Sequence, residues 1–256
     1  MNRTFLALLH YDGQHFVGWQ RQPKGRSVQG EFEDVLARLS GRRTVAHAAG
    51  RTDTGVHALG MGVSFSLPAK WEPTGLRRAL NALLPRDCWV AEAHEMTAGF
   101  HARKSAEGRR YRYLIGTDDT ALSPFRRPYE WALGRELNLP DLQKAAGYLV
   151  DELDFRAFAV RSSPRPHYRC KIRLAEWTAR AEAPGARFDV AADRFLHHMV
   201  RLLVGTMVDM GLGRRPVADM PSLLRRTDND ETSPPAPPQG LYFLGAEYTA
   251  KCFVNG

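Results

Sequence analysis

Apolar positions along the chain alternate between a strand period and a helix period, which predicts short strands separated by amphipathic helices. In the first hundred residues these patterns predict strands at 5–9, 44–49, 63–67 and 88–93 and helices at 28–39 and 76–83. Ser27 can cap the first helix, and Pro73 lies near the start of the second. The predicted order is β-α-β-β-α-β.

The second half repeats this order. Its patterns predict strands at 111–115, 170–179, 186–192 and 241–248 and helices at 142–149 and 195–211. The sequence therefore predicts an α+β fold of two ferredoxin-like, RRM-like units, each with an antiparallel sheet and helices on one face. We expect domains at 1–104 and 105–256, joined between Ala98 and Gly108. The proline-rich stretch 233–238 is expected to be an extended connector.

Charge narrows the class of partner. The chain has 256 residues, a formal net charge of +8, and 36 basic residues, of which 6 are Lys and 30 are Arg. Arginine grips phosphate with a planar fork and stacks on bases, so the charge points to a nucleic-acid partner about as strongly as to a chance bias toward arginine on a solvated surface. The hydrophobic share of 43% is that of a globular protein rather than a disordered one.

Cysteine usage and hydropathy indicate a reducing, non-membrane setting, and we expect a cytoplasmic protein. Cys88, Cys170 and Cys252 are odd in number, far apart and outside any CxxC pattern, which argues against a disulfide framework or a cysteine-rich zinc site. The first apolar run, 5–9, is too short for a signal peptide or a membrane span.

The stretch Gly50-Arg51-Thr52-Asp53-Thr54-Gly55 holds the most informative chemistry. Arg51 favours the ionised Asp53 carboxylate, and the glycines let the backbone approach a ligand closely. Taken alone, the stretch is better explained as a surface turn with an incidental Arg-Asp pair. Asp53-Thr54-Gly55 also matches the short motif of aspartic proteases, but those enzymes need two such carboxylates and the chain has no second copy.

The whole chain resembles the tRNA pseudouridine synthase A family. The blocks that carry the resemblance occur in the family's order: Tyr11-Asp12-Gly13, Gly18-Trp19-Gln20-Arg21-Gln22, Val28-Gln29-Gly30, Gly50-Arg51-Thr52-Asp53, Gly55-Val56-His57-Ala58, Phe100-His101-Ala102-Arg103, Tyr111-Arg112-Tyr113, 195–201 and 236–242. Thr54 departs from the family's usual alanine. The segment 167–172 matches loosely, and no role is carried onto it.

The resemblance implies a cofactor-free isomerisation of uridine to pseudouridine at positions 38, 39 and 40 of the tRNA anticodon stem-loop. Asp53 is implied as the catalytic carboxylate, which either attacks C1′ or removes a proton from C2′ of the ribose. Tyr111 is expected to stack on the uracil, although its period alone fits a core strand tyrosine. Arg51 and Arg201 are candidates to keep Asp53 ionised and to contact phosphate, and Leu241 is expected in the pocket wall.

The resemblance also implies a homodimer and an RNA-binding cleft between the two units, with each tRNA spanning both subunits. The target base must be flipped into the site. Arginines and lysines throughout the chain are candidates for phosphate contacts, with the loop residues Arg21, Lys24 and Arg26 preferred. No metal is expected: His197 and His198 would point apart on a helix and make a poor chelating pair. The alternative function is a non-catalytic RNA-binding protein with two RRM-like units.

Overall fold

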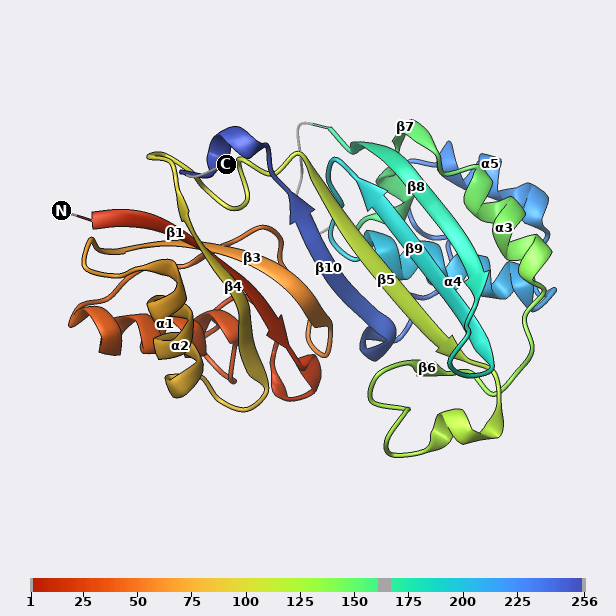
Figure 1. Cartoon of the computed structure of the whole chain (residues 1–256). Helices are drawn as coiled ribbons and strands as arrows, with labels where there is room; N and C mark the ends of the chain where they lie inside the picture. Colours follow the sequence, from red (N-terminus) through yellow and green to blue (C-terminus); the bar gives the residue numbers. More distant parts are fainter. Residues whose placement is uncertain (1, 161–166, 255–256) are drawn as a thin grey trace. The chain divides into compact units, whose positions relative to one another are not determined.

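The computed structural model describes residues 2–160 and 167–254, which form a mixed α+β fold (Figure 1). The chain divides into two compact units: unit 1 comprises residues 1–109 and 242–256, and unit 2 comprises residues 110–241. The predicted α+β class is confirmed. Among the described residues, no helix combines the length and the apolar character that a membrane crossing requires.

Unit 1 has the predicted β-α-β-β-α-β order. Its elements are β1 (Asn2–Tyr11), α1 (Val28–Ser40), β2 (His47–Ala48), β3 (His57–Pro68), α2 (Pro73–Leu83) and β4 (Cys88–Met96). The sheet runs β4-β1-β3, with both neighbours of β1 antiparallel to it and β2 paired with β3. This is the strand order of a ferredoxin-like unit. The predicted second strand is therefore real but spans only two residues.

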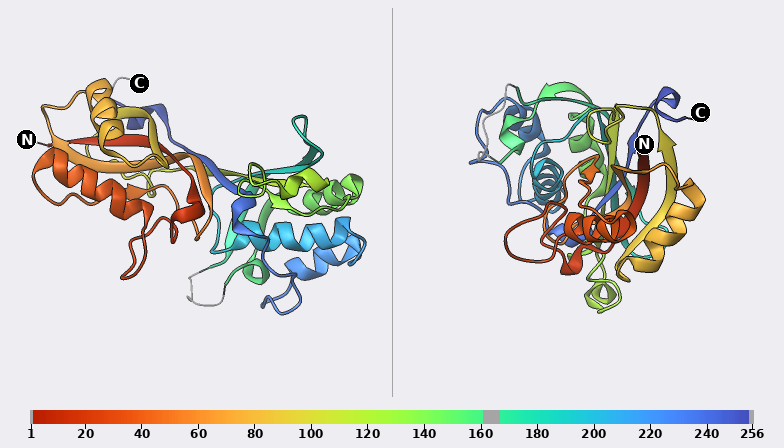
Figure 2. Two further views of the ribbon diagram at one scale, coloured as in Figure 1. Left: turned by 90° about the horizontal axis from the view of Figure 1, so that it is seen from below. Right: turned by 90° about the vertical axis from the view of Figure 1, so that its left-hand side faces the viewer.

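One face of this sheet is covered by α1 and α2 (Figure 2). The Ser27 side chain accepts a hydrogen bond from the Gly30 amide and starts α1, as predicted, and Gly41 ends it with a φ of 73°. Phe32 of α1 packs edge-on against Phe65 of β3, with ring centroids 5.4 Å apart. The apolar stripe of the sequence thus becomes the contact between helix and sheet.

Unit 2 holds the second set of elements. These are β5 (Gly108–Gly116), β6 (Trp131–Ala132), α3 (Leu139–Gly147), β7 (Asp151–Asp154), β8 (Arg169–Ala179), β9 (Gly185–Ala192), α4 (Met199–Gly211) and α5 (Met220–Leu224). Its strands follow the order β5-β9-β8-β7, so the strand pair predicted around residue 184 lies beside β5, and β7 is an added edge strand. Trp177 of β8 stacks on Phe188 of β9 at 4.9 Å and contacts Met207 of α4.

The helix α4 begins four residues later than the pattern predicts. Apolar periodicity placed its start at residue 195, whereas the helix starts at Met199. His198 has a φ of 62°, a left-handed conformation that stops the helix from extending backward. Periodicity reports which residues are buried, and Phe195 and Leu196 are buried or partly buried without being helical.

The last strand, β10 (Leu241–Glu247), returns the chain to unit 1. Tyr242 and Phe243 pair in parallel with His57 and Ala58 of β3. The backbones come so close that a Cβ on Gly60 would lie 2.3 Å from the Leu244 carbonyl oxygen. Tyr248 then donates a hydrogen bond to the Ala102 carbonyl. From Tyr242 onward this strand belongs to the same compact unit as residues 1–109.

The segment 233–237 has no regular secondary structure, Pro238 begins the short 3-10 turn Pro238–Gly240, and the segment is packed rather than loose. Its Ser233 amide donates to the Thr206 hydroxyl, and the Ala236 amide donates to the Arg201 carbonyl, both on α4. A Cβ on Gly205 would lie 2.1 Å from the Pro234 carbonyl oxygen. The absence of a side chain at Gly205 lets this segment lie directly on the helix and fixes where β10 begins.

Candidate active site

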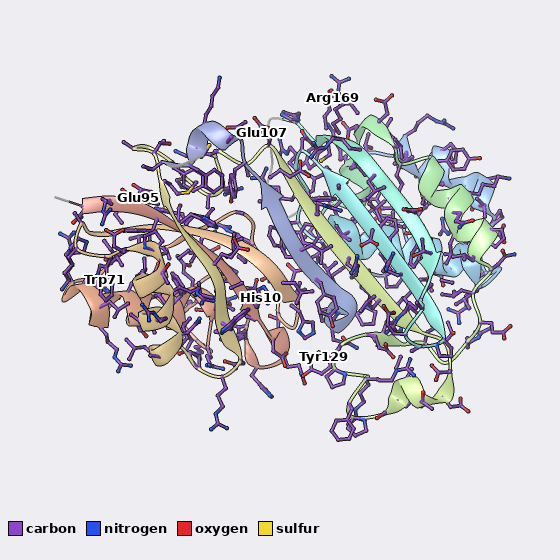
Figure 3. All side chains as sticks on the ribbon, viewed as in Figure 1. His10, Trp71, Glu95, Glu107, Tyr129 and Arg169 are labelled. Atoms are coloured by element: carbon purple, nitrogen blue, oxygen red, sulfur yellow. The ribbon has the colours of Figure 1, made fainter. Side chains whose placement is uncertain are left out.

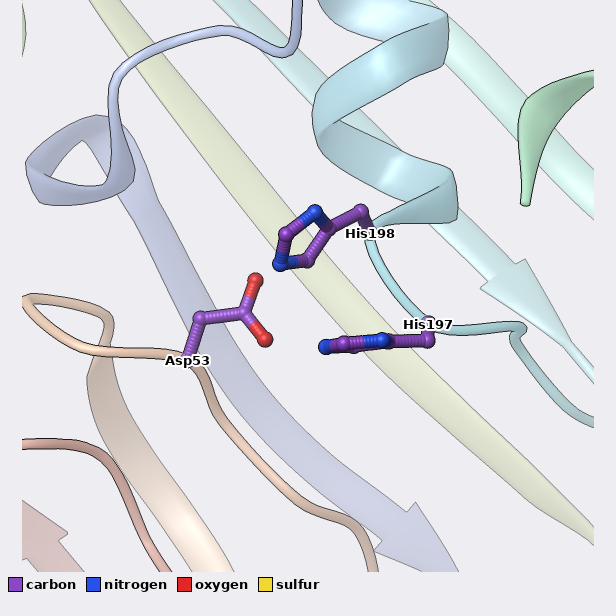
Figure 4. A group of neighbouring side chains, drawn as sticks. All are labelled: Asp53, His197 and His198. Carbon is purple, nitrogen blue, oxygen red and sulfur yellow. The ribbon is translucent and has the colours of Figure 1, made fainter. Parts of the chain in front are cut away.

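Asp53 lies in unit 1, in the loop that joins β2 to β3. Its side chain is partly buried, Thr52 before it is buried, and Arg51 is exposed. The Val56 amide donates to the Asp53 carbonyl at 3.2 Å, and Gly55 takes a φ of 79°, so the chain turns directly after the carboxylate. Figure 4 draws the Asp53 side chain rising from this loop. The loop expected from the sequence is therefore a tight, well-defined turn.

A second loop, residues 12–19, holds the Asp53 loop in place. The Trp19 amide donates to the Thr52 carbonyl at 3.1 Å. Gly18 has a φ of 102°, and a Cβ there would lie 2.6 Å from the same carbonyl oxygen. Only glycine fits such an approach, so the Gly18-Trp19 pair of the sequence acts as a backbone support for the residue before the carboxylate.

Tyr11 adds a buried side-chain contact to this support. Its hydroxyl and the Thr52 hydroxyl are 2.7 Å apart, and both side chains are buried. The Tyr11 ring also lies against the rings of Phe16 and Trp19, with centroids 6.4 and 6.5 Å away. Because a buried hydrogen bond and two ring contacts restrain Tyr11, it holds Thr52 firmly and restricts Asp53 next to it.

His57 closes the other end of the Asp53 loop. It is only 2% exposed, its Nδ1 accepts a hydrogen bond from the Gly13 amide at 3.1 Å, and its ring stacks on Tyr242 of β10 at 4.9 Å. A Cβ on Gly13 would lie 2.2 Å from the Val56 carbonyl oxygen. No role was predicted for Tyr11, Gly13 or His57 from sequence. The signal that pointed to them was their presence in the motif blocks.

Tyr111 lies on β5 in unit 2. It is buried, and its ring meets Phe195 edge-on at a centroid distance of 5.0 Å. Two residues along the same strand face, the Tyr113 hydroxyl donates to the Pro237 carbonyl at 2.6 Å, and burial raises the pKa of Tyr113 well above its usual value. The strand thus carries two buried tyrosines, of which Tyr113 has a structural partner in the proline-rich segment.

Arg201 occupies the first turn of α4 and is not a plain surface charge. Its Nε donates to the Ala236 carbonyl at 2.7 Å, while its own carbonyl accepts from the Ala236 amide at 2.9 Å. This pair of contacts ties the guanidinium to the segment that leads into Leu241, the buried first residue of β10. Of the residues carried over from the resemblance, Arg51 and Asp53 therefore belong to unit 1, and Tyr111, Arg201 and Leu241 to unit 2.

Comparison with known proteins agrees with these elements. A family model described as tRNA pseudouridine synthase matches residues 7–103 and 145–249. The chain belongs to the tRNA pseudouridine synthase family. A protein named tRNA pseudouridine synthase A from Moorella thermoacetica is 40% identical over 94% of this chain and 97% of its own length. Proteins of the same name from Geobacillus kaustophilus and Myxococcus xanthus are 36% and 39% identical, covering 100% and 91% of this chain and 98% and 87% of their own lengths.

For a member of this family, the basic loop 21–26 is of interest because tRNA is polyanionic, and its three cations differ in their surroundings. Lys24 is exposed at the loop tip. Arg21 donates to Glu33 on α1 at 2.8 Å and keeps part of its guanidinium exposed. Arg26 is already bound by other side chains of the protein. It contacts both carboxylate oxygens of Asp87 and one of Glu31, and its guanidinium carbon lies 4.3 Å from the centre of the Phe16 ring.

The carboxylates around Arg26 raise the pKa of its guanidinium, with the hydrogen bond to Asp87 as the largest cause. A guanidinium that is already neutralised by two carboxylates gains less from a phosphate than a solvated one does. The same holds for Arg21, whose guanidinium lies 2.8 Å from Glu33 and 3.8 Å from Asp34, so the exposed Lys24 is favoured over Arg26 for contact with the backbone of tRNA.

His197 and His198 come from the segment just before α4 (Figure 4). The prediction that they diverge on a helix rested on wrong geometry, because the helix begins at Met199. Their rings lie 4.2 Å apart, centroid to centroid, at an angle of 50°. His198 has a left-handed backbone here, with a φ of 62°, so the two rings are not placed by helix geometry.

Proposed function

We propose that this protein isomerises uridine to pseudouridine at positions 38, 39 and 40 of the tRNA anticodon stem-loop, with Asp53 as the catalytic carboxylate. The observation that carries the proposal is the construction of the Asp53 loop. Thr52 is held by Trp19 and Tyr11, and the turn after Asp53 is closed by Val56, so a partly exposed carboxylate stands on a fixed backbone. Catalysis needs a reacting group held in one geometry, which this loop provides.

The isomerisation breaks the C1′–N1 bond of the nucleotide and makes a bond from C1′ to C5 of the same uracil. The proton on C5 is lost and N1 gains one, so the atoms balance without an oxidant or a leaving product. Asp53 acts on the ribose, either as the nucleophile at C1′ or as the base that takes the C2′ proton. No cofactor is part of this scheme.

The remaining residues bind the substrate. Tyr111 stacks on the flipped uracil, as its aromatic setting beside Phe195 supports. Arg51, exposed beside Asp53, contacts phosphate. Arg201 is oriented by Ala236 and serves the same purpose from α4. Leu241 supplies apolar surface to the base.

The substrate is recognised mainly by shape and backbone charge, since neighbouring positions with different sequence contexts are all modified. Arg21 and Lys24 supply charge for this, in a chain with a net charge of +8. The protein acts as a cytoplasmic homodimer in which one tRNA contacts both subunits.

The deciding experiment measures release of tritium from tRNA labelled at C5 of uridine. The wild-type protein releases it, Asp53→Asn does not, and Glu182→Gln on the exposed turn between β8 and β9 serves as the control that retains full activity. Filter binding of the same tRNA should give Asp53→Asn an affinity close to that of the wild type, because phosphate contacts dominate affinity. Binding without any tritium release by the wild type would instead support the alternative of a non-catalytic RNA-binding protein.

A further inference from the structure

His57 is a buried histidine to which the proposed chemistry assigns no task. It is the first residue of β3, four positions after Asp53, and only 2% of it is exposed. Its surroundings belong to unit 1, as the ring itself does: they are the loop 12–19, the Asp53 loop and Tyr242 of β10. A buried polar ring costs free energy unless it is hydrogen-bonded, so its contacts indicate what it does.

The hydrogen bond from the Gly13 amide fixes the tautomer of this ring. An amide N–H can only donate, so the Nδ1 atom of His57, 3.1 Å away, accepts, and the neutral ring carries its proton on Nε2. The Asp12 carboxylate lies 3.3 Å from the same Nδ1. Its two oxygens accept from the amide and the side chain of Gln14, at 3.0 and 2.9 Å. His57 therefore serves Gly13 as a hydrogen-bond acceptor.

Gly13 in turn lies directly against the Asp53 loop. A Cβ on Gly13 would lie 2.2 Å from the Val56 carbonyl oxygen and 2.9 Å from the Gly55 carbonyl carbon. The Val56 amide donates to the Asp53 carbonyl. A shift of Gly13 would therefore displace the two residues that close the turn after Asp53. The Nδ1 atom of His57 holds Gly13 where this close packing is possible.

Tyr242 fixes the plane of the His57 ring. The two rings stack with centroids 4.9 Å apart and an angle of 21° between their planes. Tyr242 is itself buried, and its backbone pairs in parallel with that of His57. A ring held flat against a buried aromatic neighbour keeps its nitrogen atoms in one direction. The Nδ1 atom is thus aimed at Gly13 by β10.

The Asp53 loop is consequently held at both ends. Thr52, before the carboxylate, is held by Trp19 and Tyr11, and His57 holds the end after it. We propose that His57 is a positioning residue for the proposed isomerisation: by accepting the Gly13 hydrogen bond through Nδ1, it fixes the geometry of the Asp53 carboxylate. It acts through Gly13 and the Asp53 loop rather than on the substrate. This rests on the proposed function and adds a residue to its site.

Two substitutions separate the acceptor atom from the ring. His57→Asn places an acceptor oxygen near the position of Nδ1 but loses the ring, whereas His57→Phe keeps the ring on Tyr242 and leaves the buried Gly13 amide without its acceptor. In the tritium assay, corrected for folded protein, we expect kcat to fall by about tenfold or more in His57→Phe, with KM nearly unchanged, and to stay within about threefold of the wild type in His57→Asn. A side chain that only fills space gives the reverse order, because Phe preserves more of the buried volume.

An isosteric pair repeats the comparison if His57→Phe does not fold. Leu and Asn branch at the same atom and have similar shapes, but only Asn offers an acceptor. His57→Leu should therefore lose kcat where His57→Asn retains it. Thermal melting gives the folded fraction of each variant.

His10 supplies the matched control (Figure 3). It is a partly buried histidine on β1 of the same unit, and its ring packs edge-on against Trp89 at a centroid distance of 5.1 Å. Successive residues of a strand point to opposite faces, so its side chain points away from that of Tyr11. His10→Asn and His10→Phe should both leave kcat unchanged.

Hydrogen exchange measures the hold on the loop without any reference to activity. The Val56 amide, which donates to the Asp53 carbonyl, should exchange about tenfold faster or more in His57→Phe and at nearly the wild-type rate in His57→Asn. The rates are measured for each amide by NMR at a temperature at which all three proteins are folded.

The outcomes separate this proposal from the function on which it rests. A wild-type chain that releases no tritium overturns the proposed function, and the exchange rates then still decide whether His57 holds the loop. If the wild type is active and His57→Phe turns over as fast as His57→Asn or faster, the positioning role is wrong. A Val56 amide that exchanges equally fast in all three proteins overturns it as well.

Discussion

At the scale of single residues, the position of the Asp53 carboxylate depends on the neighbours that hold Thr52. Thr52 is the link, because its carbonyl receives the Trp19 amide and its hydroxyl meets the Tyr11 hydroxyl. A small displacement of a reacting group costs far more in rate than in binding. Residues of this support should therefore show their effect in turnover.

Replacing Tyr11 with Phe tests this. The ring and its contacts with Phe16 and Trp19 remain, while the buried hydrogen bond to Thr52 is removed, at a cost of about 1–2 kcal/mol. We expect kcat to fall by about tenfold with KM nearly unchanged, measured in the tritium assay. A loss of activity that merely follows the folded fraction in thermal melting would show that Tyr11 has only a structural role.

Tyr111 offers a second prediction at this scale. Tyr111→Phe keeps the ring beside Phe195 and retains tRNA binding, whereas Tyr111→Ala loses stacking worth about 1–3 kcal/mol and most of its turnover. Tyr111→Leu keeps an apolar side chain but removes the aromatic ring. This variant should remain folded, and its turnover should be lower than that of the wild type. Rates are compared after correction for folded protein. Equal corrected rates for Leu and Tyr would favour the core-tyrosine interpretation.

At the scale of elements, the loop 12–26 has two parts with different roles. Residues 12–19 support the Asp53 loop through Gly13, Gly18 and Trp19. Residues 21–26 carry the cations. The ion pairs of Arg26 with Asp87 and Glu31 join the loop to the rest of unit 1, so this arginine is part of the scaffold.

The salt dependence of tRNA binding can distinguish the cations of this loop that contact phosphate from the one that stabilises the fold. Arg21→Ala combined with Lys24→Ala should flatten the log–log slope by roughly 0.7–0.9 for each phosphate that the protein no longer neutralises. Lys144→Ala combined with Lys251→Ala removes the same charge from exposed positions elsewhere and should leave the slope as it is. An equal change in both double variants would contradict a local contact. Arg26→Ala should instead lower the free energy of unfolding, by about 1–2 kcal/mol.

At the scale of the whole molecule, the proposed isomerisation requires no added group. Treatment of the protein with EDTA should leave turnover unchanged. Because tRNA needs magnesium to fold, the control is the same assay on tRNA folded with magnesium, with that magnesium restored. Added nucleotides should also have no effect. Loss of activity on chelation that one specific transition metal restores, with tRNA folding verified separately, would contradict the cofactor-free scheme.

The sequence by itself determined the element order, because apolar periods of 2 and 3.6 residues record which side chains must be buried. The strand at 63–67, the helix at 28–39 and its Ser27 cap all follow from local pattern and occur in the structure. The family also followed from sequence, because the motif blocks occur in the family's order along the chain, and the role of Asp53 stays a prediction from the same blocks. Local pattern carries this information because the spacing of apolar residues within one element sets which of its faces must be buried.

Tertiary structure alone decided which segments meet. The parallel pairing of β10 with β3, the contact of Tyr11 with Thr52 and the commitment of Arg26 to Asp87 join residues far apart in the chain. No local period encodes such a pairing. The late start of α4 is similar: the left-handed backbone of His198 overrides an apolar pattern that would have continued the helix. The sequence pattern indicates which side chains are buried. Which other segment covers them is decided only when the whole chain packs.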